Sequence, residues 1–438
     1  MLGSCTTPKR DAYLEQEKEQ GYNNTMRIVF VGPFAMEPKR TMAVRALPLG
    51  KALAARGHQV VMLLPPWDKP QDAGKEWIED GVYVRNVLLP ARLPLLQHLL
   101  LTWRLLHSAL KHNPAVIHCF KPKSYAGLAA WALWQWKRMG QTQVRLVVDT
   151  DDWEGPGGWN ELGQYSWVQK RFFAWQERWG LTHCDAVTVA SRALETIVWS
   201  LGVPPTRVHY LPNGWWPEEH SVAAHKIAAL REQYGFGNAP IALLYTRFFE
   251  YRLERVLAII QGVLAKAPET RWLIVGKGLF GEEEQLLAMA REQGLAPYIA
   301  YAGWVPPEQL PAYFALAKVA IYPFDDTLIN RTKCAVKLID LLAAGVPVVA
   351  DNVGQNAEYI EHGISGLLVA PDETEHFVDA VVQLLRDPDL ARRLGKAAQA
   401  RMRNAFAWHK LAERAERAYQ SQEPGTSIHN KAAASSLC

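Results

Sequence analysis

A single carboxylate, Asp340, interrupts an apolar run that begins at Leu338. Leucines recur around it at helical spacing, and Gly345 ends the helix before a valine-rich strand. Because burying an unpaired carboxylate costs several kcal/mol, Asp340 needs a partner. One candidate partner is a ribose diol, which an acceptor-only group at the carboxyl edge of a parallel sheet binds in dinucleotide folds. An ion pair with Lys337, three residues back on the same helix face, explains the residue equally well.

Two arginines, Arg247 and Arg252, follow the strand PIALLY. They would lie at the carboxyl end of a parallel strand, where such sheets bind ligands. Two guanidinium groups there suit a diphosphate, which they hold through bidentate charge-assisted bonds. The structural alternative is a pair of surface arginines bonded to Glu250 or Glu254.

Four carboxylates gather after an apolar strand in the segment VVDTDDWEG: Asp149, Asp151, Asp152 and Glu154. Packed acids at the end of a strand raise one another's pKa, and such clusters often bind a metal or transfer protons. A cap for the following helix would explain Asp152 without any chemistry.

The segment GKGLFG (276–281) fits G-x-G-x-x-G, follows the strand RWLIV and opens a helix, which is the context of a dinucleotide site. Three glutamates, 282–284, come next, where a pyrophosphate would rest, and their charges would repel it. The following strand, YIAYAG, carries no terminal acid that could hold a ribose. Both observations argue against a nicotinamide or flavin oxidoreductase.

Strands and helices alternate in two runs that must position these residues. The first run opens with MRIVFVGPF and continues through QVVMLL, VYVRNVLL, AVIHCF, VRLVVD and AVTVA. The second opens at 240–245 and contains helices predicted over 252–266, 282–293, near 308–317 and 335–344. Strands that alternate with helices of about ten or more residues predict parallel sheets with helices on both faces.

A length of 438 residues predicts two domains of ordinary size. The predicted segments are an N-terminal tail (1–25), a first Rossmann-like domain (26–215), a linker (216–239), a second such domain (240–400), a C-terminal helix (401–421) and a disordered tail (422–438).

Composition limits the class of protein. Hydrophobic residues make up 49% of the chain, and a net charge of +4 without a Lys/Arg block argues against nucleic-acid binding. The 5 cysteines are scattered without CxxC spacing, which argues against a disulfide framework or a zinc site and fits a reducing cytoplasm. Residues 1–25 lack the apolar core of a signal peptide, and no apolar run is long enough to span a membrane. We therefore expect a cytoplasmic protein, for which peripheral contact with the inner membrane face stays open.

Tryptophan is abundant, with 17 residues. Val168, Phe172, Trp175 and Trp179 fall on one helix face, and the segment 91–112 is leucine-rich with basic residues interspersed. We expect both segments to be core helices packed on the sheet, because apolar stripes usually indicate core. Interfacial membrane helices combine the same stripe with Trp and Lys/Arg, and aromatic rings also stack on sugars.

The stretch TKCAVKLIDLLAAGVPVVA (332–350) resembles the donor-binding signature of glycosyltransferase family 4, whose members have the GT-B fold of two facing Rossmann-like domains. That signature has two glutamates eight positions apart, an apolar helix, a Gly-x-Pro and a Val-rich strand. Asp340 matches the second acid, which holds the nucleotide ribose in the family. Thr332 stands where the first glutamate is expected. Three residues replace the glycines that usually follow it: Lys333, Cys334 and Ala335.

The resemblance covers about residues 26–420 and implies further site residues. Arg247 matches an arginine that stabilises the departing nucleoside diphosphate, and Arg252 stands where the family usually has lysine. The N-terminus of the helix 335–344 is an expected anion site, to which Lys333 adds charge. The remaining implied positions are Gly32, Gly278, Gly303 and Val305 around the donor and His118 near the acceptor. The C-terminal helix is expected to cross back to the first domain, as in relatives.

Three interpretations of the acid cluster compete. Asp-Thr-Asp is the metal-binding motif of the other large glycosyltransferase fold, but that fold has one nucleotide domain. It is also the nucleophile motif of haloacid-dehalogenase-like phosphatases, although Trp153 then replaces a Thr or Val. We prefer the loop where family 4 enzymes often place a histidine and an aspartate facing the acceptor, so that Asp151 aligns with the histidine and Asp152 with the aspartate. Asp151 would then accept the proton of the acceptor or stabilise positive charge on the sugar.

The resemblance implies a retaining, metal-independent glycosyltransferase without a cofactor. It would move a sugar from a UDP- or GDP-sugar to a hydroxyl of a saccharide or lipid-linked acceptor. Arg247, Arg252 and a helix end would do the electrostatic work of a metal. Thr332 in place of glutamate motivates the alternative, a non-catalytic protein that binds nucleotide sugars or acts as a scaffold.

Overall fold

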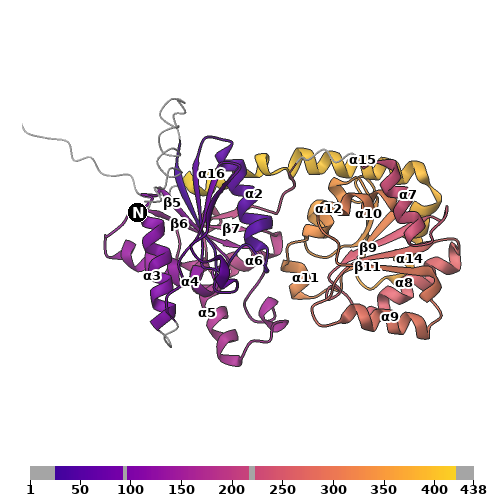
Figure 1. Cartoon of the computed structure of the whole chain (residues 1–438), viewed down its shortest axis with the longest axis horizontal. Coiled ribbons are helices and arrows are strands. Elements are labelled where there is room, and N and C mark those ends of the chain that lie inside the picture. The colour runs from indigo at the N-terminus through magenta and orange to yellow at the C-terminus, as the bar shows by residue number, and fades with distance from the viewer. Residues whose placement is uncertain (1–24, 92–95, 217–221, 421–438) are drawn as a thin grey trace, which may run out of the picture.

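The computed structural model describes residues 25–91, 96–216 and 222–420. Two α/β domains lie side by side, and long C-terminal helices run along one side of both (Figure 1). The predicted tails at 1–25 and 422–438 lie outside the described residues except for Thr25, and so do the linker residues 217–221 and the leucine-rich residues 92–95.

The described part of the first domain contains one eight-stranded sheet, with the order β3-β4-β2-β1-β5-β6-β7-β8. Neighbouring strands are parallel except β3, which pairs antiparallel with β4. The strands are β1 (Arg27–Val31), β2 (Gln59–Leu64), β3 (Glu76–Glu79), β4 (Val82–Asn86), β5 (Val116–Phe120), β6 (Arg145–Thr150), β7 (Ala186–Val189) and β8 (Val208–Tyr210). The helices are η1 (Met42–Ala46, a π-helix), α2 (Leu47–Ala54), η2 (Pro70–Asp72), α3 (Leu96–Leu110), α4 (Ser124–Arg138), η3 (Trp159–Glu161), α5 (Trp167–Thr182), α6 (Arg192–Ser200) and η4 (Pro205–Arg207).

The described part of the second domain contains a six-stranded sheet, with the order β11-β10-β9-β12-β13-β14 and parallel neighbours throughout. The strands are β9 (Ile241–Thr246), β10 (Arg271–Gly276), β11 (Ile299–Gly303), β12 (Val319–Tyr322), β13 (Val348–Asp351) and β14 (Leu367–Val369). The helices are α7 (Ala224–Gln233), α8 (Leu253–Lys266), α9 (Glu282–Glu292), η5 (Ala296–Tyr298), α10 (Leu310–Leu316), α11 (Leu328–Thr332), α12 (Val336–Ala343), α13 (Asn356–Tyr359), α14 (Thr374–Arg386), α15 (Pro388–Ala405) and α16 (Trp408–Gln420).

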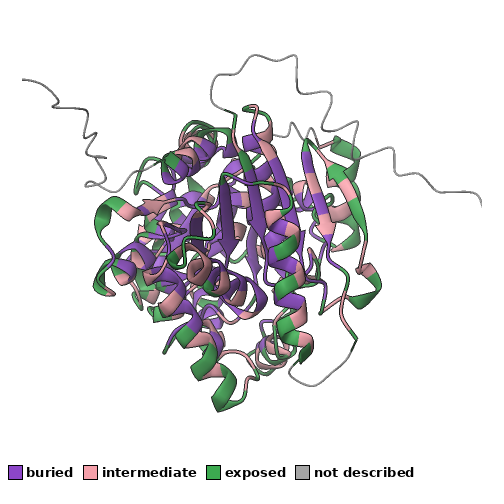
Figure 2. Ribbon diagram, turned by 90° about the vertical axis from the view of Figure 1, so that its left-hand side faces the viewer, coloured by how far each residue is buried: buried purple, intermediate pink, exposed green. Residues whose placement is uncertain are grey.

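Each sheet is covered on both faces, which explains the continuous apolar runs of the strands. Buried residues fill the central strands, and exposed residues lie on the outer faces of the helices (Figure 2). In the first domain α3 and α4 share one core with the sheet, and α2 and α16 share the other. In the second domain α12 and α10 pack on one face, and α8 and α14 on the other.

The C-terminal helices link the two domains (Figure 1). Helix α15 packs on α12 and α14 of the second domain, whereas α16 packs on α2 and β8 of the first. Helix α16, which packs on the first domain, begins at the buried Trp408. The predicted boundary at 401 falls inside α15, which ends at Ala405. The predicted linker contains α7, which packs on α10 of the second domain.

The aromatic face of α5 corrects one expectation. Trp167 is 70% exposed and Val168 66%, and Phe172 and Trp175 are also exposed. The core prediction for this face is therefore wrong, although α3 does bury Leu101, Leu105 and other residues of its stripe. Among the described residues, no helix has the length and apolar character needed to cross a membrane.

Candidate active site

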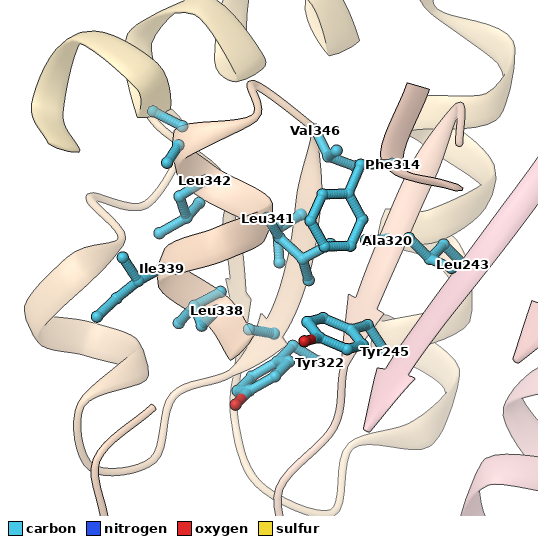
Figure 3. Close-up of a cluster of buried hydrophobic side chains, with 14 of the residues drawn as sticks. Leu243, Tyr245, Phe314, Ala320, Tyr322, Leu338, Ile339, Leu341, Leu342 and Val346 are labelled. Carbon is cyan, nitrogen blue, oxygen red and sulfur yellow. The ribbon is translucent and has the colours of Figure 1, made fainter. Parts of the chain in front are cut away.

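Helix α12, which carries Asp340, is fixed to the second sheet by one apolar face. Figure 3 shows Leu338 and Leu341 packed toward the strands that carry Tyr245 and Tyr322. The chain turns back after the helix at Gly345, whose φ of +74° is a left-handed conformation that suits glycine. The polar residues of the helix are left at its margin, next to the carboxyl ends of β9 and β12.

Asp340 and Lys337 both contact Tyr245. The hydroxyl of Tyr245 lies 3.5 Å from Oδ2 of Asp340, and Nζ of Lys337 lies 3.5 Å from the centroid of the same ring. Burial raises the pKa of Asp340 to about 6, against the opposing charge of Lys337. Burial likewise lowers the pKa of Lys337 to about 8. Asp340 is thus a partly desolvated carboxylate next to the carboxyl end of β9.

The predicted donor loop, residues 332–335, is bonded on both sides. The hydroxyl of Thr332 donates to its own helix at the Leu328 carbonyl (2.8 Å). The ammonium of Lys333 pairs with Glu250 at 2.7 Å, and both are buried. Two backbone amides are also taken: that of Cys334 donates to Asp152 Oδ1 of the first domain (3.3 Å), and that of Ala335 donates to Gln355 Oε1 (2.9 Å).

The two predicted arginines have different surroundings. The guanidinium of Arg247 lies 5.7 Å from the ring centroids of Phe249 and of Trp159, which belongs to the first domain. Arg252 is 63% exposed and pairs with Asp372 at 2.5 Å and with Asp325 at 3.3 Å. Exposed pairs of this kind contribute about 0–1 kcal/mol, so Arg252 exchanges partners at little cost.

The predicted glycines serve the backbone. The amide of Gly278 donates to Glu283 (2.9 Å), so the helix's own acid satisfies the glycine-rich turn. Gly303 has a left-handed φ of +70°, and Val305 beyond it is buried. A Cβ on Gly32 would lie 2.7 Å from the side chain of Leu64, so a larger residue in this turn after β1 would displace that buried side chain.

In the first domain, three of the four carboxylates surround one lysine. Nζ of Lys121 lies 3.2 Å from Asp151, 2.9 Å from Asp152 and 3.2 Å from Glu154. Lys121 follows β5 directly, and Phe120 pairs with Asp149 on the neighbouring strand β6. The parallel register therefore brings the ends of both strands to the same place.

Burial and charge separate the protonation of these acids. Burial raises the pKa of Asp151 to about 7, and the lysine opposes that rise only partly. For Asp152, burial acts in the same direction, but Lys121 and the Cys334 amide outweigh it and lower the pKa. Burial also raises the pKa of the neighbouring Glu177 well above its ordinary value. Asp151 is thus a carboxyl group that changes charge near neutral pH.

The fourth carboxylate, Asp149, and His118 are structural. Asp149 forms two bonds of 2.6 and 2.7 Å with the buried Arg45 and accepts a bond of 2.6 Å from Thr188. His118, predicted on the acceptor side, is instead fully buried between Tyr419 of α16 (2.9 Å) and Thr188 (3.0 Å). Successive residues of a strand face opposite sides of the sheet, and His118 lies on the side that α16 covers.

Lys121 and Lys123 are the charged residues that sequence reasoning missed. Nζ of Lys123 lies 2.8 Å from Glu154 and lies over the ring of Tyr165 at 4.5 Å. The signal was available, because the segment KPK follows β5 directly and the ends of neighbouring parallel strands meet at one sheet edge.

The acid cluster and the predicted donor loop meet where the domains face each other. Besides the Asp152–Cys334 bond, Sγ of Cys334 lies 3.2 Å from the carbonyl oxygen of Asp151. The acid cluster therefore adjoins the loop that leads into the N-terminus of α12. Within the described residues, no group of three or more His, Cys, Asp or Glu side chains is arranged to hold a metal ion.

Comparisons with protein families match one family to each of the two domains. Residues 40–214 match the family described as glycosyl transferase 4-like domain, and residues 240–387 match glycosyl transferases group 1. The chain is 28% identical over 237 residues to the GDP-mannose-dependent alpha-(1-6)-phosphatidylinositol monomannoside mannosyltransferase of Mycobacterium tuberculosis, covering 52% of this chain and 60% of that protein. It is 26% identical over 229 residues to the alpha-D-kanosaminyltransferase of Streptomyces kanamyceticus, covering 51% of this chain and 57% of that protein. The aligned part thus spans about three-fifths of these relatives' length.

Solved structures share the two-domain fold. Anabaena HepE in complex with UDP and glucose superposes with a TM-score of 0.66 at 18% identity, covering 89% of this chain and 98% of that one. The catalytic domain of Arabidopsis thaliana Starch Synthase IV, bound to ADP and acarbose, gives 0.67 at 13% identity, covering 90% and 99%. At these identities the likeness establishes the fold.

Proposed function

We propose, from the premise that this chain belongs to the GT-B glycosyltransferases of the group 1 and 4-like families, that it transfers a sugar from a nucleoside-diphosphate sugar to an acceptor hydroxyl. One observation carries the proposal. The acid cluster of the first domain, which holds the proposed proton acceptor Asp151, contacts the predicted donor loop of the second domain. Asp152 and Cys334 are hydrogen-bonded across the boundary.

The second domain would bind the donor. Asp340 would accept hydrogen bonds from the ribose diol. Arg247 and the N-terminus of α12 would face the diphosphate, and Arg252 would join them after leaving its exposed partners. The turns at Gly278 and Gly303, with Val305, would border the nucleoside, and Gly32 would approach it from the first domain.

The first domain would bind the acceptor and take its proton. In the transfer, the bond from the sugar carbon to the diphosphate breaks, a bond to the acceptor oxygen forms, and the hydroxyl proton passes to Asp151. Asp152 would orient the acceptor. We propose that the reaction retains the anomeric configuration, as the family resemblance implies, which requires the acceptor to attack from the face that the diphosphate leaves. We propose further that it uses no metal, because Lys121 already stands between the acids and the arginines would balance the leaving group.

The exposed aromatic face of α5 supports a lipid-linked acceptor and peripheral contact with a membrane. Trp167, Phe172 and Trp175 point away from the core, and Arg171 lies over the Trp167 ring at 5.1 Å. Aromatic and basic side chains on one helix face are typical of interfacial binding. A relative named above acts on a phosphatidylinositol mannoside, which fits this class of acceptor.

A thermal-shift panel of UDP, GDP, ADP and their sugars, with and without EDTA, tests the proposal. A ligand at about a hundred times its dissociation constant adds about 2.7 kcal/mol of stability, which moves the melting temperature by several degrees. Stabilisation by one diphosphate that survives EDTA, followed by transfer of the matching sugar, supports the proposal. A response to none of them contradicts it.

The donor loop favours a second candidate, a protein that binds nucleotide sugars without turning them over. The Thr332 hydroxyl is bonded to its own helix, and the Lys333 ammonium is paired with Glu250. Neither group is therefore available to a sugar in this arrangement. Binding of a donor sugar without hydrolysis or transfer would select this candidate.

A further inference from the structure

Lys121 has the geometry of a residue that organises others. Its amide donates to the Asp149 carbonyl at 2.9 Å, which ties it to the end of β6, and its own φ is +50°. Its side chain is 7% exposed, and the ammonium lies 3.2 Å or less from three carboxylates. A non-glycine residue at positive φ is uncommon and persists where surrounding contacts fix it.

We infer that Lys121 is a positioning residue for the transfer reaction. It holds the Asp151 and Asp152 carboxylates beside the donor loop and supplies the charge that keeps Asp151 ready to accept a proton. This inference rests on the proposed function, in which Asp151 takes the proton of the acceptor. It concerns a residue that need not touch the substrate.

The charged groups around Asp151 indicate that Lys121 provides its compensating positive charge. From its own segment, Asp149 and Asp152 face it with negative charge, and Glu177 adds to the cluster from α5. Cys334 approaches from the donor loop. Arg45 of η1 also bears on Asp151, but its bidentate bonds go to Asp149. Within the part of the chain that the structure describes, Lys121 is therefore the cation in direct contact with Asp151.

Lys123 provides a matched control. It is a lysine two residues away, nearly as buried, and it pairs with Glu154 at 2.8 Å and with Asn160 at 2.5 Å. Replacing it removes one positive charge from the same cluster while the contact of Lys121 with Asp151 stays. A difference between the two lysine variants thus reports position rather than net charge.

The first arm measures turnover of the active UDP-, GDP- or ADP-sugar against pH for the wild type, Lys121→Met, Lys121→Arg and Lys123→Met. An opposite charge within about 4–6 Å moves a carboxyl pKa by about 1–3 units. We therefore expect the acid limb of kcat/KM, which reports the free enzyme, to lie near pH 7 in the wild type and to move up by at least about one pH unit in Lys121→Met. Lys121→Arg restores it, and Lys123→Met leaves it in place. An unmoved limb in Lys121→Met, or an equal shift in both Met variants, overturns the inference.

The second arm needs no activity and separates failure of the inference from failure of the proposed function. When folding raises the pKa of a carboxyl group, the folded protein loses stability as the pH rises from the unfolded-state pKa of that group to its folded-state pKa. Lys121→Met should extend that loss of thermal stability above pH 7. The extension should vanish in the Lys121→Met/Asp151→Asn double variant. If the wild type turns over no donor, the proposed function fails. If thermal stability depends on pH equally in the single and double variants, the coupling between Lys121 and Asp151 is overturned. Lys121→Arg supplies the folded comparison if Lys121→Met does not fold.

Discussion

Replacing Arg45 by methionine should destabilise the first domain more than any surface charge change. The guanidinium is 1% exposed and makes two bonds to Asp149, one to Asn213 (2.8 Å) and one to the Leu211 carbonyl (2.9 Å). These partners come from the end of β6 and from the segment that leads out of β8 toward the second domain. Arg45 thus joins the candidate site to the domain crossing.

The magnitude follows from what remains after the change. Asp149 would stay buried with the Thr188 hydroxyl as a neutral partner. Removing one member of a buried ion pair costs about 3–5 kcal/mol, because the other charge is left uncompensated. For a domain of about 200 residues, each kcal/mol moves the melting temperature by about 2–4 °C. We therefore expect a loss of about 6–20 °C.

Tryptophan fluorescence suits the assay because a two-domain protein need not unfold in one step. Eleven of the 17 tryptophans lie in residues 131–216, so the signal reports mainly the first domain. Arg56→Met is the matched control, since Arg56 pairs with Glu416 at 2.6 Å while 36% exposed. Exposed pairs contribute about 0–1 kcal/mol.

The double variant Arg45→Met/Asp149→Leu makes the reasoning refutable. With neither charge left in the core, it should recover more than half of the loss, since well-packed apolar residues replace buried pairs at little cost. A loss below about 1 kcal/mol in Arg45→Met, or a double variant no more stable than the single one, would refute the assignment of the cost to an unpaired Asp149.

Two further predictions address ligand binding. Asp340→Asn should weaken binding of the preferred nucleoside diphosphate by about 10- to 150-fold, the equivalent of a charged hydrogen bond of about 1.5–3 kcal/mol. Because the pKa of Asp340 is about 6, the wild-type affinity measured by calorimetry should fall as the pH drops below 6. A variant with unchanged affinity would exclude the ribose role. Phe172→Ser should reduce binding to anionic lipid vesicles by about 10- to 150-fold through the loss of about 1.5–3 kcal/mol of apolar burial. The melting temperature should change little because the side chain is exposed. Binding is measured by vesicle flotation with Trp199→Ser, on α6, as the control, and equal binding of the wild type and both variants would exclude α5 as the contact.

The fold was predictable because its signals are local. Apolar strands alternating with helices predicted both sheets, and Gly345 marked the end of α12. The misses have physical reasons. Strand β3 is short and lies at the sheet edge, so its residues show no apolar run. Helix α7, inside the predicted linker, buries no residue fully and has a weak apolar face, so periodicity does not reveal it.

The candidate site was less predictable because it depends on which strand ends meet. His118 and Lys121 are three residues apart, but the first faces α16 and the second faces the acids. The exposed face of α5 has the same periodicity as a core face, since spacing shows which residues share a side and not what covers it.

The hydrogen bonds of residues 332–335, the predicted donor loop, determine what a ligand must supply to bind there. Lys333 is paired with Glu250, the Cys334 amide with Asp152, and the Ala335 amide with Gln355. A ligand that takes any of these groups must supply an equivalent acceptor, because a buried donor left without one costs about 1–3 kcal/mol. Sugar hydroxyls and phosphate oxygens are such acceptors. The bond to Asp152 is special among the three because it crosses the domain boundary, so a ligand that replaces it also loosens the contact between the domains.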